Sequence, residues 1–182
     1  TSIEGMTTFF APQRTHARVG ILNTGSIRRE SHAGILGPVI AYSAEQFFDT
    51  MNSVLTVNLG DMPDTEAVVK AMKDPKTKAI VVISHALGNA PYPIRRAAIE
   101  AAKAGKLVIN VSRALMGNTN ERYYVSLGSI NERELKGTGY MTIEGGRLSN
   151  RTAKALIVRA LLEGRDQKSA SDLIEQYKAR TF

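Results

Sequence analysis

Short apolar runs alternate with helical patterns through most of this chain of 182 residues. Residues 78–84 (KAIVVIS) and 106–111 (KLVINV) are almost continuously apolar, which is typical of strands buried on both faces of a parallel sheet. Shorter runs at 18–23 (RVGILN) and 54–58 (VLTVN) predict two more strands. Because helical patterns separate these runs, the chain is predicted to form an α/β fold, a three-layer parallel sheet with helices on both faces.

Helix starts and ends are marked by capping residues. Ser43 and Gln46 form a capping box in which each side chain reaches the other residue's backbone, so a helix is expected from Ser43 onward. Asp64, which follows a proline, is expected to cap a helix that ends near Met72.

The later helices carry similar signals. Pro93 fits the first position of a helix. Gly105 is expected to end that helix in the left-handed conformation, which glycine tolerates. Ser149 is expected to open a strongly amphipathic helix, and Ser169 with Asp172 predicts a second capping box for the last helix.

Domain organisation follows from where periodicity begins. Residues 1–15 have none and are expected to form an N-terminal arm, while residues 16–182 are long enough for a single α/β domain. The stretch TSIEGMTTFF lacks the basic start and apolar core of a signal peptide, and no apolar run approaches the roughly 20 residues of a membrane span. We expect a cytoplasmic protein that makes no membrane contact.

Composition excludes several chemistries. The chain has no cysteine, so disulfides, zinc–thiolate sites and thiol catalysis are excluded. Its histidines, His16, His32 and His85, lack metal-ligand spacing. We therefore expect neither a metal nor a cofactor.

The net charge of +7 is unevenly placed: residues 1–50 are neutral, 51–110 carry +3 and 111–182 carry +4. The only adjacent basic pairs are Arg28-Arg29 and Arg95-Arg96. The basic surface permits binding of nucleic acid or another polyanion, but we favour the interpretation that it is a solvated face.

Four segments together resemble one known family. An apolar strand leads into residues 87–91 (LGNAP), and a later strand leads into Ser112-Arg113 with Gly117 four residues on. Residues 145–154 (GGRLSNRTAK) enter a long helix, and residues 174–177 (IEQY) lie in the closing one. Their order and spacing are similar to those in the C-terminal α/β domain of the L-asparaginase/glutaminase family, over about residues 54–180.

The resemblance implies an asparaginase-like form of the flavodoxin/Rossmann-like fold, assembled as a homo-oligomer with a small amide or carboxylate ligand. In that register Asn89 reaches across a subunit contact toward a neighbour's substrate, or else stabilises its own tight loop. Ser112 and Arg113 follow a strand, where they would hold a carboxylate or phosphate, although Arg113 would equally suit an acid of a partner subunit. Asn89 and Arg113 are expected at the same edge of the sheet.

The family's catalytic set is incomplete in these residues. Thr24 and Ser26 stand where the family's Thr-Gly-Gly-Thr loop has its nucleophile, but one glycine is missing and the Thr-Asp-Thr triplet is absent. His85 is a candidate general base near Ser84 or Ser112. The alternative, which we favour, is a histidine at a strand end with no catalytic role.

These observations favour a non-catalytic, oligomeric binding or structural component of asparaginase-like fold. One alternative is an amidohydrolase acting on asparagine-like amides through a site shared between subunits. The other is a basic protein that binds nucleic acid.

Overall fold

The computed structural model describes residues 21–23, 26–28, 42–61, 64–85, 88–113, 119, 126–146 and 148–181. They belong to two compact units, residues 1–52 and residues 53–182. The arm expected over residues 1–15 lies outside the described residues, and the single domain expected from residue 16 stays a prediction.

The first unit contains a two-stranded sheet and a helix. Strands β1 (Ile21–Asn23) and β2 (Ser26–Arg28) pair antiparallel. The strand expected at 18–23 therefore exists in part, but its expected place in a series of parallel strands is wrong. Only two residues separate β1 from β2, and so short a connection permits an antiparallel pair but not a parallel one.

Helix α2 (Ala44–Asn52) begins at the predicted capping box. The Ser43 hydroxyl accepts a hydrogen bond from the Gln46 backbone N–H (3.1 Å), and the Gln46 side-chain oxygen accepts one from the Ser43 N–H (3.0 Å). Because the motif is complete within four residues, the sequence alone was enough to locate it.

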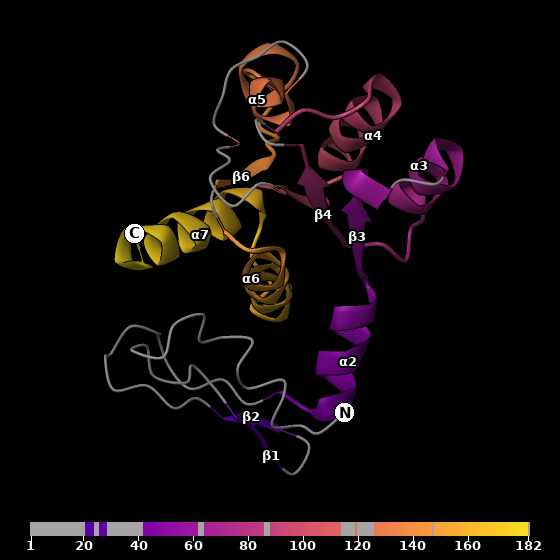
Figure 1. Cartoon of the computed structure of the whole chain (residues 1–182). Coiled ribbons are helices and arrows are strands. Elements are labelled where there is room, and N and C mark those ends of the chain that lie inside the picture. The colour runs from indigo at the N-terminus through magenta and orange to yellow at the C-terminus, as the bar shows by residue number, and fades with distance from the viewer. Residues whose placement is uncertain are drawn as a thin grey trace. The chain divides into compact units, whose positions relative to one another are not determined.

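The second unit is the α/β part of the chain (Figure 1). Its sheet has the order β3-β4-β5-β6, and all three strand pairs are parallel. The strands are β3 (Val54–Asn58), β4 (Ala79–Ser84), β5 (Leu107–Ser112) and β6 (Ile143–Gly146). The helices are η2 (Leu59–Asp61), α3 (Thr65–Lys73), α4 (Tyr92–Lys103), η3 (Leu127–Ser129), α5 (Ile130–Arg133), α6 (Asn150–Leu162) and α7 (Gln167–Thr181).

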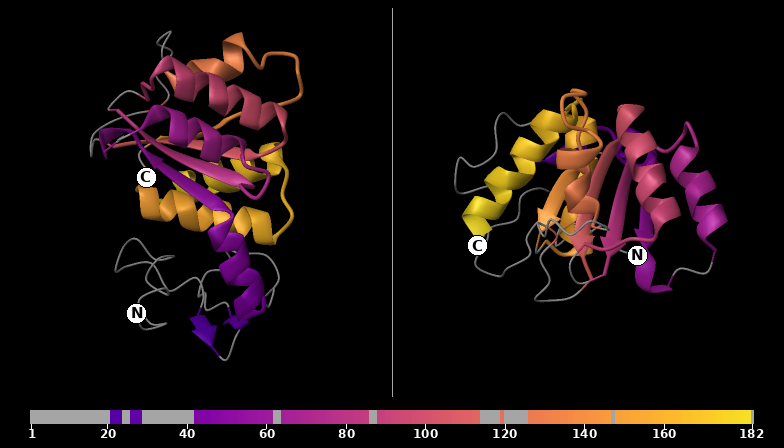
Figure 2. Two further views of the ribbon diagram at one scale, coloured as in Figure 1. Left: turned by 90° about the vertical axis from the view of Figure 1, so that its right-hand side faces the viewer. Right: turned by 90° about the horizontal axis from the view of Figure 1, so that it is seen from above.

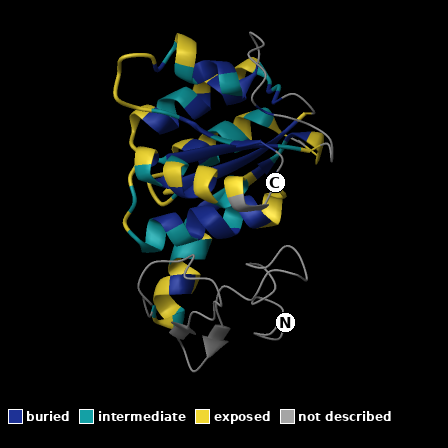
Figure 3. Cartoon of the chain, turned by 90° about the vertical axis from the view of Figure 1, so that its left-hand side faces the viewer, coloured by how far each residue is buried: buried dark blue, intermediate teal, exposed yellow. Residues whose placement is uncertain are grey.

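Helices cover both faces of this sheet (Figures 1 and 2). On one face α3, α4 and α5 pack over a cluster that includes Ile80, Val82 and Val108. On the other face α6 contacts β3, β4 and β5, and α7 contacts β6. The strands between them are largely buried (Figure 3). The predicted three-layer α/β architecture is confirmed for this unit.

Most predicted helix ends are confirmed. The Asp64 carboxylate accepts hydrogen bonds from the N–H groups of the first turn of α3 (2.9 and 3.2 Å), and the Ser149 hydroxyl does the same for α6 (3.0 Å). Gly105 follows α4 at φ +81°, a conformation that glycine adopts without strain. Pro93 is the second residue of α4, because the helix begins at Tyr92.

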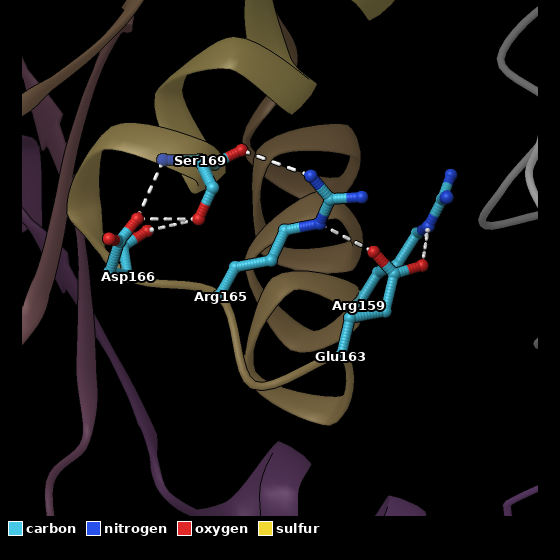
Figure 4. A network of polar contacts seen from close by, with 5 residues as sticks. All are labelled: Arg159, Glu163, Arg165, Asp166 and Ser169. Atoms are coloured by element: carbon cyan, nitrogen blue, oxygen red, sulfur yellow. Dashed lines mark hydrogen bonds and ion pairs between the residues drawn. The ribbon is translucent and has the colours of Figure 1, made fainter.

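The start of α7 was predicted wrongly. Ser169 lies inside the helix, and Asp166 is the capping residue: its carboxylate accepts from the Ser169 N–H (2.8 Å) (Figure 4). The Asp166 carbonyl also accepts from the Ala170 N–H (2.9 Å). Arg165, just before it, donates to Glu163 (2.5 Å) and to the Ser169 carbonyl (3.2 Å), which ties the end of α6 to the start of α7. Asp166 and Ser169 lie three residues apart, and either side chain can cap a helix. The contacts that Arg165 makes favour Asp166, so the helix starts at the earlier position.

A register shift interrupts the pairing of β5 with β6. Asn110 pairs with Glu144, whereas Val111 pairs with Gly146, so Gly145 is the extra residue on β6. A Cβ on Gly145 would lie 2.4 Å from Val111 Cγ1 and 2.7 Å from the Asn110 carbonyl oxygen. Only glycine lets the two strands approach this closely at the irregularity.

Candidate functional site at the carboxyl edge of the sheet

Strands β4 and β5 end together. Ser84 and Ser112 are register partners, and the Arg113 N–H donates to the Ser84 carbonyl (2.8 Å). The segments that carry Asn89 and Arg113 therefore leave the sheet at the same edge, as expected. Ligands of open α/β sheets bind at this edge, since the strand ends and their loops form a crevice there.

The loop after β4 is tied to a distant part of the chain. The Gly88 N–H donates to the His85 carbonyl (2.8 Å), and Gly88 adopts φ +84°. The Leu127 N–H then donates to the Gly88 carbonyl (2.9 Å), and Asn89 forms an antiparallel bridge with Ser126. These contacts hold Asn89 in place, and its side-chain Oδ1 is buried without a hydrogen-bond partner.

The structure does not pair His85, the candidate base, with a reactive hydroxyl on Ser84. Ser84 is fully buried and its hydroxyl donates to the Val111 carbonyl (3.0 Å), whereas His85 is exposed. The Ser84 proton is thus committed to the backbone.

Arg113 lies over the turn that follows β3. A Cβ on Gly60 would fall 2.1 Å from Arg113 Nη1 and 2.7 Å from its Cζ, so the guanidinium occupies the space above that glycine. The Asn58 side chain supports the turn, since its Oδ1 accepts from the Gly60 N–H (3.1 Å). The exposed Arg113 guanidinium is therefore positioned by β3 as well as by β5.

The remaining candidates stay predictions. Thr24 lies outside the described residues, and Ser26 is the first residue of β2 in the other unit. Ser112 is the last residue of β5 and is partly exposed.

Two residues at this edge were missed by the sequence analysis. Asn110 on β5 is 1% exposed, and neither its Oδ1 nor its Nδ2 has a hydrogen-bond partner. Its neighbour Glu144 on β6 has two carboxylate oxygens that are both buried and without a partner. For Asn110 the available signal was one polar residue inside an otherwise apolar run, whereas the short segment around Glu144 (IEGG) carries no such signal.

Burial dominates the electrostatics of Glu144. It raises the pKa of this carboxyl to about 7, against smaller lowering effects of the Thr119 hydroxyl and the Lys178 ammonium. The Thr119 hydroxyl accepts from the Gly146 N–H (2.8 Å), and although it lies near Glu144 it makes no well-formed hydrogen bond to either carboxylate oxygen. Desolvation without an ion-pair partner is therefore the main influence on this group.

Comparison with known proteins identifies the family. The sequence model of the glutaminase/asparaginase C-terminal domain matches residues 60–174, well over half of the chain. This chain belongs to the glutaminase/asparaginase C-terminal domain family. The matched residues span β4, β5, β6 and most of the helices around them, so the asparaginase-type domain is the second unit described above. No curated protein sequence matches this one.

Solved structures agree on the fold of the asparaginase-type domain. L-asparaginase I from Vibrio cholerae is 16% identical in sequence to this chain, with a TM-score of 0.53. The matched region covers 67% of this chain and 35% of the Vibrio protein. A probable cytoplasmic L-asparaginase from Campylobacter jejuni is 21% identical with a TM-score of 0.51, and 66% of this chain covers 36% of that one. The chain thus spans about a third of the length of these two proteins.

Two kinds of feature are absent from the described residues. None of the described helices is both long and apolar enough to cross a membrane. Within the same residues, no three side chains of His, Cys, Asp or Glu gather as metal ligands.

Proposed function

We propose that the chain is a non-catalytic binding component that holds a small amide or carboxylate ligand at the carboxyl edge of β4 and β5, within a homo-oligomer. The observation that carries this proposal is the placement of Asn89. Its loop is tied down by Ser126 and Leu127, and its Oδ1 is buried but unpartnered, on the same edge as Arg113. A buried acceptor without a donor loses about 1–3 kcal/mol, which a bound N–H group recovers.

The two side chains suit one class of ligand. The Asn89 oxygen accepts hydrogen bonds from an amide or an amine, and the Arg113 guanidinium binds a carboxylate with two parallel hydrogen bonds. Amino acids with a side-chain amide or acid carry both groups. The two solved neighbours are L-asparaginases, which supports asparagine and its relatives as the first ligands to test.

A binding role is favoured over hydrolysis because the described residues show no activated nucleophile. The 182 residues contain no Thr-Asp-Thr triplet. In the asparaginase-type domain the Ser84 hydroxyl donates to a backbone carbonyl rather than to a base. A hydroxyl without a base to take its proton is a weak nucleophile.

Isothermal titration calorimetry with L-asparagine, L-aspartate and L-glutamine tests the proposal, with native mass spectrometry of the same sample. We expect binding that weakens about tenfold or more in Asn89→Ala and in Arg113→Ala, since a lost hydrogen bond to a charged group is worth about 1.5–3 kcal/mol. Arg96→Ala is the matched control, because Arg96 is exposed on α4 and pairs with Glu100 (3.2 Å). Absence of binding, or equal affinities for all three variants, would refute the ligand role, and a monomer would refute the assembly.

Family membership favours one second candidate, an amidohydrolase whose site is shared between subunits. Release of ammonia from asparagine or glutamine by the purified chain, lost in Thr24→Ala or Ser26→Ala, would establish it. Binding without turnover would support the non-catalytic role instead.

A further inference from the structure

We propose that Asn110 and Glu144 form a buried site for one small monovalent cation, beneath the main chain of Gly88 and Gly128. This site is separate from the proposed ligand-binding role of Asn89 and Arg113 and does not depend on it.

The polar side-chain atoms of Asn110 and Glu144 lie together in the interior. Asn110 and Glu144 are register partners on adjacent parallel strands, so their side chains leave the same face of the sheet next to each other. None of their four buried side-chain polar atoms makes a well-formed hydrogen bond, although the Thr119 hydroxyl lies near enough to lower the pKa of Glu144. Buried polar groups in native proteins are almost always satisfied by protein, water or an ion, so this cluster indicates a bound species.

The Glu144 carboxyl has no ion-pair partner among the described residues. Lys178 donates instead to the Glu144 main-chain carbonyl (3.1 Å) and to the Glu175 carboxylate (2.5 Å). Glu175 adds a further negative charge nearby. A buried anion needs a partner of opposite charge, and one positive charge makes this site neutral.

The described donor atoms favour a monovalent over a divalent ion. In the part of the chain that the structure describes, no three acidic or histidine side chains converge, whereas Ca²⁺ requires 6–8 oxygen ligands and Mg²⁺ a strict octahedron. One carboxylate with neutral amide and carbonyl oxygens suits ammonium, which donates hydrogen bonds to them, or an alkali ion, which coordinates them. The experiment distinguishes these two sources.

The two glycines bring the main chain against the pair. A Cβ on Gly88 would lie 2.9 Å from Asn110 Nδ2, and a Cβ on Gly128 would lie 3.4 Å from Glu144 Oε1. The same Cβ on Gly128 would lie 2.5 Å from the Thr119 carbonyl oxygen, which places a further acceptor beside the cluster. Without side chains at these positions, the main chain of Gly88 and Gly128 lies close to Asn110 and Glu144.

Thermal unfolding of the full chain at pH 8 provides the test. Ammonium, potassium and choline chlorides are compared at equal ionic strength, with choline as the ion too large for the site. We expect ammonium, potassium or both to raise Tm by about 2–4 °C over choline in a saturable manner. A rise with ammonium alone indicates hydrogen bonding, and a rise with both indicates coordination. Equal Tm values in all three salts overturn the proposal.

Variants separate this effect from general salt effects. Glu144→Gln removes the buried charge and is expected to abolish the cation-dependent rise, even if its own Tm differs. Glu66→Gln, which removes an exposed glutamate from α3, is the matched control and keeps the rise. A rise that persists in Glu144→Gln refutes the site.

A crystallographic readout locates the ion. Crystals of the full chain grown with thallium(I), a heavy stand-in for potassium and ammonium, are expected to show an anomalous peak between Asn110 and Glu144. Ordered water alone at that position overturns the proposal.

Discussion

Arg95 of α4 donates hydrogen bonds to both carboxylate oxygens of Glu134, at 2.5 and 2.9 Å, just beyond α5. The same guanidinium donates to the Ser129 hydroxyl (3.0 Å), and Arg95 is only 8% exposed. One side chain thus connects α4 to η3 and α5. Because η3 follows the residue that bridges Asn89, this ion pair also supports the loop after β4.

Replacing Arg95 is expected to destabilise the fold. Arg95→Met leaves Glu134 and Ser129 without their donor, and we expect a loss of about 2–3 kcal/mol in the free energy of unfolding, measured by urea denaturation. Arg96→Ala, one residue along and exposed, is expected to cost less than about 0.5 kcal/mol. Similar losses in both variants would contradict the role of the pair.

The burial of Arg95 also affects the polyanion alternative. The Arg95-Arg96 pair presents only Arg96 to solvent, and Arg96 itself pairs with Glu100. Of the other adjacent basic pair, Arg29 lies outside the described residues. The pattern of basic residues therefore gives less support to nucleic-acid binding than the sequence by itself suggests.

Glu144 is expected to make stability fall with rising pH. Its pKa is raised from 4.5 to about 7 in the folded state, so between these values the folded chain keeps a proton that the unfolded chain releases. Stability from this group therefore declines from about pH 4.5 to pH 7 and is constant above.

Glu144→Gln removes that decline. In the absence of a stabilising cation, we expect the variant to match the wild type near pH 4 and to exceed it by about 3 kcal/mol at pH 8, measured by urea denaturation across pH. Other titrating groups cancel in the difference between the two proteins. A difference that does not change with pH would contradict the buried state of this carboxyl.

Gly145→Ala is expected to cost about 2 kcal/mol, because a Cβ there meets the Val111 side chain and a rigid backbone carbonyl. Gly60→Ala is the informative comparison: its Cβ meets the end of the flexible Arg113 side chain, which can move away. For Gly60→Ala we expect a free energy of unfolding within about 0.5 kcal/mol of the wild type. We also expect this variant to bind the ligand more weakly in calorimetry, because the Arg113 side chain is displaced. Equal destabilisation by both substitutions would show that the contacts do not decide the outcome.

Gln167 is expected to be the most sensitive polar residue of α7. Its Nε2 donates to the carbonyls of Ala102 (2.8 Å) and Lys106 (2.9 Å), and its Oε1 accepts from the Met141 N–H (2.8 Å). Gln167→Leu removes all three hydrogen bonds, although the Ala102 carbonyl still accepts from the Gly105 N–H (2.9 Å), and is expected to cost about 2–3 kcal/mol in urea denaturation. Gln176→Leu, at an exposed position of the same helix, should change stability little; a comparable loss there would argue against the bonds of Gln167 as the cause.

Features that depend on near neighbours were predictable. The capping pair of Ser43 and Gln46, the cap at Asp64 and the left-handed Gly105 each involve residues within four positions, and the pattern located all three. The cap at Ser169 failed under the same rule, because Asp166 offers a competing carboxylate three residues earlier. Local rules identify a helix start to within a turn but do not choose between adjacent caps.

The amino-acid sequence alone determined the α/β class, three of the four strands of the parallel sheet and its asparaginase-type motifs, since periodicity and loop signals are local properties of the chain. The tertiary structure decided which polar groups meet: Arg95 with Glu134, 39 residues apart, Gln167 with Ala102, 65 apart, and Asn110 with Glu144 across two strands. A pattern of hydrophobic positions specifies that a strand is buried, but not its neighbour or register. Those depend on the packing of the whole sheet, and only there do Asn110 and Glu144 lie side by side.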